Sequence, residues 1–313
     1  MDIDILVFIQ NLREMSGGCL NSFFIFVSAI AIEPYIMLPA LIIFWSVDKK
    51  KGMTVLGSYG LSRYCGAVLK TIFCVSRPWV RSSRVIPLKE AFEGATGYSF
   101  PSGHSITASG MYGGLISAYR KYKGVCLFFG LMIIVTLFSR IFIGVHTPQD
   151  VIVGAAVGLL SAFIMTILLE WSDRRKNCDV VILTVSFILC IAALCYVSLK
   201  SFPMDYVNGV LLVDPAEMTL PAFEDLGRFL GIIIGWFVER RFIRFEISAQ
   251  TDRKVLCSLI GSFLFLLYYT SVVSFAGKVF NTGLAIFSLQ MSMPLIFMTI
   301  YPCIFWSMQK KRV

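Results

Sequence analysis

Charged residues and histidine are both scarce in this chain of 313 residues. Only 15% of the residues are charged, whereas 57% are hydrophobic. Soluble globular domains have a charged fraction of about one quarter, so this composition excludes an ordinary soluble core and favours a polytopic membrane protein. Only two histidines occur, His104 and His146. An apolar bundle can pack without histidine, so their placement points to chemistry.

The nine cysteines lack the spacing of a metal or redox motif. Their number is odd, no Cys-x-x-Cys pair occurs, and most lie within apolar stretches. We interpret them as small buried hydrophobic residues rather than as disulfides or metal ligands. No cluster of Asp and Glu indicates a metal site either. We therefore expect neither a metal nor another cofactor.

Apolar stretches long enough to cross a bilayer recur along the chain. A transmembrane helix needs about 17–25 such residues. Stretches of this kind lie near residues 20–47, 52–74, 103–119, 124–139, 148–170, 179–199, 224–239, 254–276 and 283–306. The first stretch is longer than one span needs and is interrupted by Glu33-Pro34. It can therefore form either one kinked span or two short helices. The sequence predicts an all-α, polytopic transmembrane helical bundle of about nine spans.

The net charge of +9 follows a membrane topology and does not indicate a nucleic-acid partner. Most of the Lys and Arg residues cluster in alternate loops, at 49–51, 120–123, 174–176, 240–254 and 310–312. Basic loops of this kind remain cytoplasmic. The loops 78–100, 140–147, 200–223 and 277–282 then face outward. We expect a plasma-membrane protein whose site lies on the extracytoplasmic face.

The N-terminal segment differs from the later spans. Met1-Asp2-Ile3-Asp4 has no basic region, so we expect no cleavable signal peptide. Residues 4–13 are amphipathic and too short to span a bilayer. They predict an interfacial helix.

The basic segment near 172–178 divides the chain into two blocks. Residues 1–177 hold both histidines, and residues 178–313 hold four further spans without a catalytic grouping. In the second block Gly227, Gly231 and Gly235 recur every four residues on one helix face. Such spacing lets helices approach closely in lipid. These three glycines could serve either internal packing or a contact between subunits of a homo-oligomer. For Gly154 and Gly158, in the first block, we predict internal packing.

The first chemical motif is Lys70-x6-Arg77-Pro78. Seven residues are two helical turns, so Lys70 and Arg77 share a face about 10 Å apart along the axis. If the helix unwinds before Pro78, both cations can converge on one anion, with arginine offering a planar fork to phosphate oxygens. Two cations that snorkel at a membrane boundary are the alternative.

The second motif, Pro101-Ser102-Gly103-His104, opens an apolar helix. Ser102 is a suitable N-cap, and Gly103 leaves its amide open to close approach. Free amides at a helix N-terminus attract phosphate. His104, within the first turn, could then protonate a leaving oxygen. A capped helix start with an incidental histidine is the alternative.

The third motif, Ser139-Arg140-x5-His146-x3-Asp150, carries the most information. Thr147-Pro148 indicates a helix start directly after His146, with Asp150 in the first turn. Asp150 could simply complement the helix end. It also lies within reach of His146, and a carboxylate bonded to one ring nitrogen makes the other a nucleophile or base. Arg140 supplies a third cation.

The loop at 78–100 joins the first two motifs and is expected to lie over the site. It holds three further cations, Arg81, Arg84 and Lys89. Contact with an anionic head group and simple solvation are both open for them.

Together the three motifs resemble the three-part signature of the type 2 phosphatidic acid phosphatase superfamily. The resemblance covers about residues 52–170, with order and spacing intact. It implies that His146 attacks phosphorus and forms a phosphohistidine, oriented by Asp150, and that His104 protonates the leaving group. It further implies that the phosphoryl oxygens are held by Lys70, Arg77, Arg140, Ser102 and Gly103.

The resemblance therefore predicts a metal-independent membrane phosphatase with a histidine-phosphatase core in residues 1–177. The expected substrate is a lipid phosphate or diphosphate: a polyprenyl diphosphate, phosphatidic acid or phosphatidylglycerophosphate. Membrane lipids are the expected partners. A glucose-6-phosphatase-like hydrolase of a soluble ester is one alternative, and a non-catalytic lipid transporter is another.

Two charges lie inside apolar stretches, Arg63 and Glu33. An isolated charge at such depth is unfavourable, so these residues usually pair or line a cavity. We expect both to face the bundle interior, either as a pair or beside the route of the lipid. Alternatively, Pro34 places Glu33 at the interface.

Overall fold

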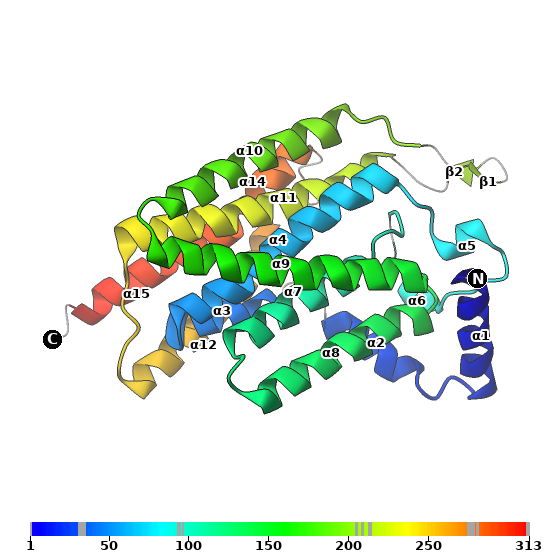
Figure 1. The fold of residues 1–313 in the computed structure, drawn as a ribbon, viewed down its shortest axis with the longest axis horizontal. Coiled ribbons are helices and arrows are strands. Elements are labelled where there is room, and N and C mark those ends of the chain that lie inside the picture. Colours follow the sequence, from blue (N-terminus) through cyan, green and yellow to red (C-terminus); the bar gives the residue numbers. More distant parts are fainter. Residues whose placement is uncertain are drawn as a thin grey trace.

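The computed structural model describes residues 2–30, 36–92, 95, 97–203, 206–207, 210–211, 215–273, 279 and 282–310. These form an elongated helical bundle (Figure 1). The helices of the first block are α1 (Asp2–Met15), α2 (Asn21–Ile30), α3 (Met37–Ser46), α4 (Lys49–Phe73), α5 (Pro78–Arg81), α6 (Lys89–Phe92), α7 (Gly103–Ala118), α8 (Lys123–Phe142) and α9 (Pro148–Arg174). The later elements are α10 (Cys178–Leu199), β1 (Tyr206–Val207), β2 (Val210–Leu211), α11 (Pro215–Val238), η1 (Glu239–Ile243), α12 (Thr251–Tyr268), η2 (Tyr269–Val273), α14 (Gly283–Leu295), η3 (Ile296–Ile300) and α15 (Tyr301–Lys310), where η marks a π-helical turn.

Five helices within the described ranges are long and apolar enough to cross a membrane. They are Lys123–Phe142, Pro148–Arg174, Cys178–Leu199, Thr251–Val273 and Gly283–Ser307. The chain is thus a helical multi-pass membrane protein, but the predicted count of nine spans is not confirmed. The stretch 20–47 contains two short helices, α2 and α3, and Glu33-Pro34 between them lies outside the described residues. α7, with 16 residues, is short for a span.

Helices α4, α7 and α9 pack against one another at the centre of the first block. A Cβ added at Gly158 of α9 would lie 2.6 Å from Ser109 Cβ and 2.7 Å from the Gly110 nitrogen of α7. A Cβ at Gly154 would lie 2.9 Å from the Ser102 carbonyl oxygen. The prediction that these two glycines serve packing is confirmed. Their small size brings the start of α7, with His104, close to the start of α9.

Helix α11 packs against α4 on one side and α14 on another. A Cβ at Gly227 would meet the Phe287 carbonyl, and one at Gly231 would lie 2.7 Å from Pro294 Cγ. A Cβ at Gly235 would lie 3.1 Å from Met298 Cβ. The glycine face of α11 is therefore covered by α14 and η3 of the same chain. This favours the internal-packing interpretation and leaves that face closed to a second copy.

Helix α1 lies across the end of the bundle that also carries α5 and α6 (Figure 1). Its Arg13 is buried and donates to the carbonyls of Phe142 at 3.1 Å and Ile86 at 2.9 Å. Gln10 Oε1 accepts a hydrogen bond of 2.8 Å from the Ile86 amide. The predicted N-terminal helix thus forms, and its polar face binds the backbone near the end of α8.

Candidate active site

The third motif folds as a capped helix start. Thr147 is the N-cap of α9, Pro148 occupies the first turn, and Asp150 completes a capping box. Asp150 Oδ2 accepts from the Thr147 amide at 2.8 Å and from Ser99 Oγ at 2.6 Å. The carboxylate that caps the helix thus also faces His146, and its catalytic role toward that ring stays a prediction.

His146 lies between a carboxylate and an arginine. Its Nδ1 is 3.5 Å from Asp150 Oδ2, and its Nε2 is 3.0 Å from Arg77 Nη1. Arginine can only donate, so Nε2 must accept and the ring proton belongs on Nδ1, facing Asp150. Burial, reinforced by Arg77, holds the pKa of His146 well below its usual 6.5. The geometry thus favours a neutral imidazole whose Nε2 lone pair is available for chemistry.

The second motif starts α7 beside this imidazole. The Ser102 hydroxyl caps the helix, accepting from the Ser105 amide at 3.4 Å and from Ser105 Oγ at 2.9 Å. His104 Nε2 is buried and has no hydrogen-bond partner among the described residues. An unpaired buried ring nitrogen is unfavourable, so this atom is suited to meet a substrate oxygen.

Three cations converge on the two histidines. Lys70 Nζ donates to the carbonyls of Tyr98 at 2.9 Å and Pro101 at 3.0 Å. Arg77 donates to the Gly97 carbonyl at 2.8 Å as well as to His146. Arg140 Nη1 donates to Ser28 Oγ, while its Nε lacks a partner within the described part of the chain. The partners named here are neutral groups, so these particular contacts do not compensate the three positive charges.

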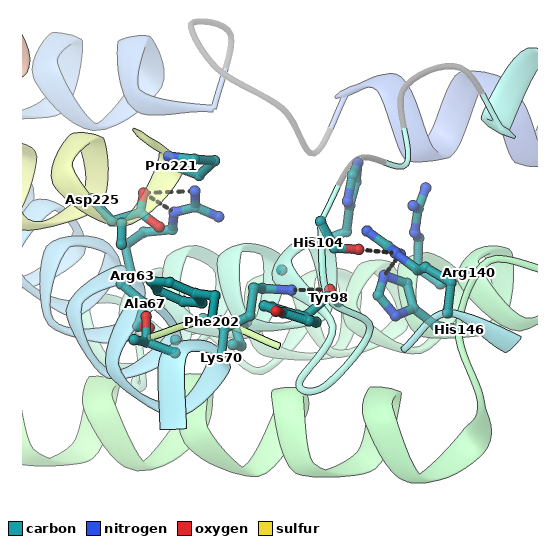
Figure 2. A pocket seen from close by; sticks show the side chains of 17 residues that line it. Arg63, Ala67, Lys70, Tyr98, His104, Arg140, His146, Phe202, Pro221 and Asp225 are labelled. Carbon is teal, nitrogen blue, oxygen red and sulfur yellow. Dashed lines mark hydrogen bonds and ion pairs between the residues drawn. The ribbon is translucent and has the colours of Figure 1, made fainter. Parts of the chain in front are cut away.

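A cavity of about 190 Å³ joins these groups (Figure 2). From the first block it is lined by Arg63, Gly66, Ala67, Lys70, Thr71, Arg77, Gly97, Tyr98, Gly103, His104, Ile106, Arg140 and His146. From the second block it is lined by Phe202, Pro221, Ala222 and Asp225. The second block, which the sequence left without chemistry, therefore contributes a wall of the same cavity.

The predicted site residues divide into three groups by position. Six of them line the cavity, namely Lys70, Arg77, Gly103, His104, Arg140 and His146. Ser102 and Asp150 are buried outside its lining, Ser102 as a helix cap and Asp150 behind His146. Their roles toward a phosphoryl group stay predictions.

Arg81, Arg84 and Lys89 do not line the cavity, and contact of these cations with a head group stays a prediction. Arg81 bonds to Asp2 at 2.8 Å and Arg84 to Asp4 at 3.0 Å. Lys89 is exposed on α6. The sequence could not reveal this, because the acidic residues that attract two of these cations belong to α1, about 80 residues earlier in the chain.

Two residues near the cavity, Ser99 and Asp225, were missed by sequence reasoning. Ser99 is fully buried and bridges the second and third motifs by donating to Asp150. Its only signal is its position two residues before Pro101. Arg63 lines the cavity as expected, but its partner is Asp225 of α11, with Arg63 Nη2 2.6 Å from Asp225 Oδ1. Glu33, the expected partner, is outside the described residues.

Comparisons with known proteins locate the same region. Residues 51–174 match the family model of the PAP2 superfamily. Undecaprenyl-diphosphatase of Sulfolobus acidocaldarius is 29% identical over 147 residues, which cover 46% of this chain and 68% of the relative. Lipid phosphate phosphatase delta of Arabidopsis thaliana is 24% identical over 164 residues, 49% of this chain and 39% of the relative. No solved structure matches the chain.

A third relative extends beyond the motif region. The probable sphingosine-1-phosphate phosphatase of Dictyostelium discoideum is 25% identical over 289 residues, covering 87% of this chain and 64% of the relative. This similarity therefore includes much of the second block as well. The resemblance indicated by the three motifs is confirmed by the family match: the region from residue 51 to residue 174, which carries both histidines and their cations, matches the family model of the PAP2 superfamily.

Proposed function

We propose that this protein is a multi-pass membrane phosphatase that hydrolyses a lipid phosphate through a phosphohistidine on His146. The observation that carries the proposal is the environment of His146. Its Nε2 accepts from Arg77, its Nδ1 faces Asp150, and it shares a cavity with His104. A nucleophile, an orienting carboxylate, a candidate acid and convergent cations are the parts that phosphoryl transfer requires.

The first step is attack of Nε2 on phosphorus. A phosphoryl oxygen competes with Nε2 for the Arg77 donor, so substrate binding moves this guanidinium from the ring to the substrate and frees the lone pair. The N–P bond forms as the bond from phosphorus to the leaving oxygen breaks. Positive charge developing on the ring is stabilised by Asp150, and Lys70, Arg77 and Arg140 stabilise the phosphoryl oxygens.

The second step releases phosphate. His104, protonated when the substrate dianion binds, gives its proton to the leaving alcohol in the first step and is then neutral. In that state it accepts a proton from water, which attacks the phosphohistidine and regenerates His146. Ser99 and the Thr147 amide hold Asp150 in place through both steps.

The membrane arrangement is part of the proposal. The remaining apolar helices, α2, α3, α4, α7 and α11, complete a bundle of about nine spans around the five clear ones. The site then lies on the extracytoplasmic face of the plasma membrane, opposite the basic loops. Residues 1–177 form the phosphatase core, and residues 178–313 form an added block that closes one side of the cavity. The lipid and diphosphate substrates in the names of the relatives support a lipid substrate.

The test is turnover by detergent-purified protein on a panel of lipid and soluble phosphates. We expect the lipid phosphates to be hydrolysed. Glucose 6-phosphate is included in the panel to test the alternative of a soluble ester substrate. An acid-labile phosphoenzyme should form in the wild type and be absent from His146→Ala, which should lose essentially all activity. Wild-type rates in His146→Ala contradict the mechanism, and glucose 6-phosphate as the preferred substrate contradicts the lipid assignment.

Sidedness has a separate test. A cysteine placed at exposed Ser83, in the loop between α5 and α6, should react with an impermeant label from outside intact cells. A cysteine at Lys121 should react only after permeabilisation. The free cysteines of the wild type give the background that must be subtracted. Labelling at the reverse positions would overturn the orientation without affecting the chemistry.

A further inference from the structure

At the end of the cavity away from His146, Arg63 and Asp225 form an ion pair. The described residues pair with only one of the two carboxylate oxygens of Asp225. Asp225 is 6% exposed and lines the cavity. Arg63 Nε at 2.8 Å and Arg228 Nη1 at 2.9 Å both donate to its Oδ1. No hydrogen bond from the described residues ends on Oδ2, which carries no dashed line in Figure 2. Within the described part of the chain, this carboxylate oxygen at the cavity is thus left without a donor.

The charge of Arg63 is already matched by a carboxylate. Its Nη1 donates to Thr107 Oγ1 at 3.1 Å, and its other nitrogens face Asp225. Arg228 is likewise engaged by Glu224 Oε2 at 2.8 Å. Two arginines and two carboxylates balance in charge. This end of the cavity is therefore a poor phosphate site but retains one strong hydrogen-bond acceptor.

The acceptor lies at the end of the cavity away from His146. Figure 2 shows Arg63 and Asp225 at one end of the cavity, Arg140 and His146 at the other, and Lys70 between them. Arg63 is two helical turns from Lys70 on α4, about 10 Å along the axis. A substrate with its phosphorus at His146 therefore extends its alcohol past Lys70 toward Asp225.

We propose that Asp225 is a specificity-determining residue that binds a hydrogen-bond donor on the substrate alcohol. This rests on the proposed phosphatase function and deepens it. The donor is a hydroxyl or an ammonium group on a long-chain alcohol phosphate. Simple polyprenyl diphosphates and fully acylated glycerol phosphates have no donor on the alcohol, so they leave Oδ2 unpaired and are the poorer substrates.

The physical reason is the asymmetry of buried hydrogen bonds. A site built around an acceptor gains from a matching donor and loses when an analogue without it excludes water from the same atom. One hydrogen bond to a charged group discriminates about 10- to 100-fold. Because the contact is to the leaving alcohol, its loss lowers kcat/KM for donor-bearing substrates specifically.

The experiment compares three phosphates of equal chain length in wild-type enzyme: a 2-amino-3-hydroxyalkyl phosphate, a 2-hydroxyalkyl phosphate and the plain octadecyl phosphate. We expect kcat/KM to be at least about tenfold higher for a donor-bearing compound than for the plain one. The amino and hydroxyl arms tell which donor the site prefers. Equal kcat/KM for all three overturns the inference, whereas no turnover of any of them contradicts the phosphatase function itself.

Variants then assign the preference to Asp225. In Asp225→Asn the ratio of donor-bearing to plain kcat/KM should fall toward one, and a ratio measured within one variant is independent of how much protein folds. Glu224→Gln is the matched control, because this neighbouring carboxylate also pairs with Arg228 but does not line the cavity. Its ratio should equal the wild-type ratio. If Asp225→Asn is too unstable to assay, Asp225→Glu keeps the charge, displaces the oxygen and should lower the same ratio. An unchanged ratio in the assayable variant overturns the assignment.

Discussion

The two walls of the cavity differ in chemistry although they share one space. The motif wall consists of Lys70, Arg77, His104, Arg140 and His146, and the α11 wall of Pro221, Ala222 and Asp225. The motif wall concentrates positive charge around two imidazoles. The α11 wall is small and apolar apart from one carboxylate that is balanced by arginines.

This difference separates two tasks. Stabilising a transferring phosphoryl group requires fixed cations at a few atoms, and the motif wall supplies them from the first block. Distinguishing one alcohol from another requires shape and a small number of polar contacts, which the α11 wall can supply. The comparison predicts that changes in the motif wall reduce activity on every phosphate, whereas changes in the α11 wall alter which phosphate is preferred.

The largest effect is expected from Arg77→Ala. It removes a phosphate cation and the donor to His146 Nε2, so kcat/KM should fall by about 10³ or more on all substrates. Arg77→Lys should restore little, because lysine lacks the planar fork. Arg84→Ala is the control, since this cation is exposed and pairs with Asp4 outside the cavity. The measurement is steady-state kcat/KM on several phosphates. A loss confined to some substrates in Arg77→Ala would contradict the separate roles assigned to the motif wall and the α11 wall.

Ser99→Ala should have an intermediate effect. The variant keeps Asp150 and its bond from the Thr147 amide but loses the 2.6 Å donor that holds Oδ2 near His146. We expect kcat to fall about tenfold with KM little changed, because binding cations are untouched and orientation is weakened. Ser99→Thr should recover part of the rate. A rise in KM alone would show that Ser99 acts on binding instead.

A smaller effect concerns pH. The folded-state pKa of His146 lies below the usual 6.5, so the unfolded chain takes up a proton as pH falls through about 6.5 while the folded protein does not. This contribution to stability is complete above pH 6.5 and is lost as pH falls toward the folded pKa. Melting temperature should therefore decline less between pH 7.5 and 5 in His146→Gln than in wild type. Identical declines would contradict the assigned neutral state.

Glycine substitutions test the support of the α11 wall. Gly231→Ala should lower the melting temperature by several degrees, because its Cβ would overlap Met291 and Pro294, and overpacking costs about 1–3 kcal/mol. Gly130→Ala is the matched control on α8, where nothing lies within 4 Å of the added Cβ. It should be neutral. Equal shifts in both variants would show that α11 does not depend on close contact with α14.

No effect is expected from metal chelation. Lys70, Arg77 and Arg140 supply the positive charge that a divalent ion supplies in other phosphatases, so activity should persist in excess EDTA. Vanadate should inhibit as a phosphate mimic. If EDTA abolishes activity and magnesium restores it, the prediction that the cations of the motif wall replace a divalent ion is wrong.

The outcome of the sequence predictions depended on how local each feature is. Helix starts at Ser102 and Thr147 were predictable because capping involves residues within one turn. The pairing of Arg81 and Arg84 with α1 was not predictable. The pairing of Arg63 with Asp225 was not predictable either, because the two residues are 162 positions apart in the chain. The predicted number of spans is not confirmed, because an apolar stretch alone does not distinguish a full span from a short helix such as α2, α3 or the 16-residue α7.

The sequence by itself determined the membrane class, the three motifs and the family resemblance, because composition, short spacing and motif order are properties of the linear chain. Only the tertiary structure decided that Asp150 serves His146 and the helix cap together, that Ser99 joins two motifs, and that the glycines of α11 face α14. It also decided that the second block reaches the cavity. These are contacts between distant segments, set by which helix faces pack together, and periodicity along one helix does not identify the partner of each face.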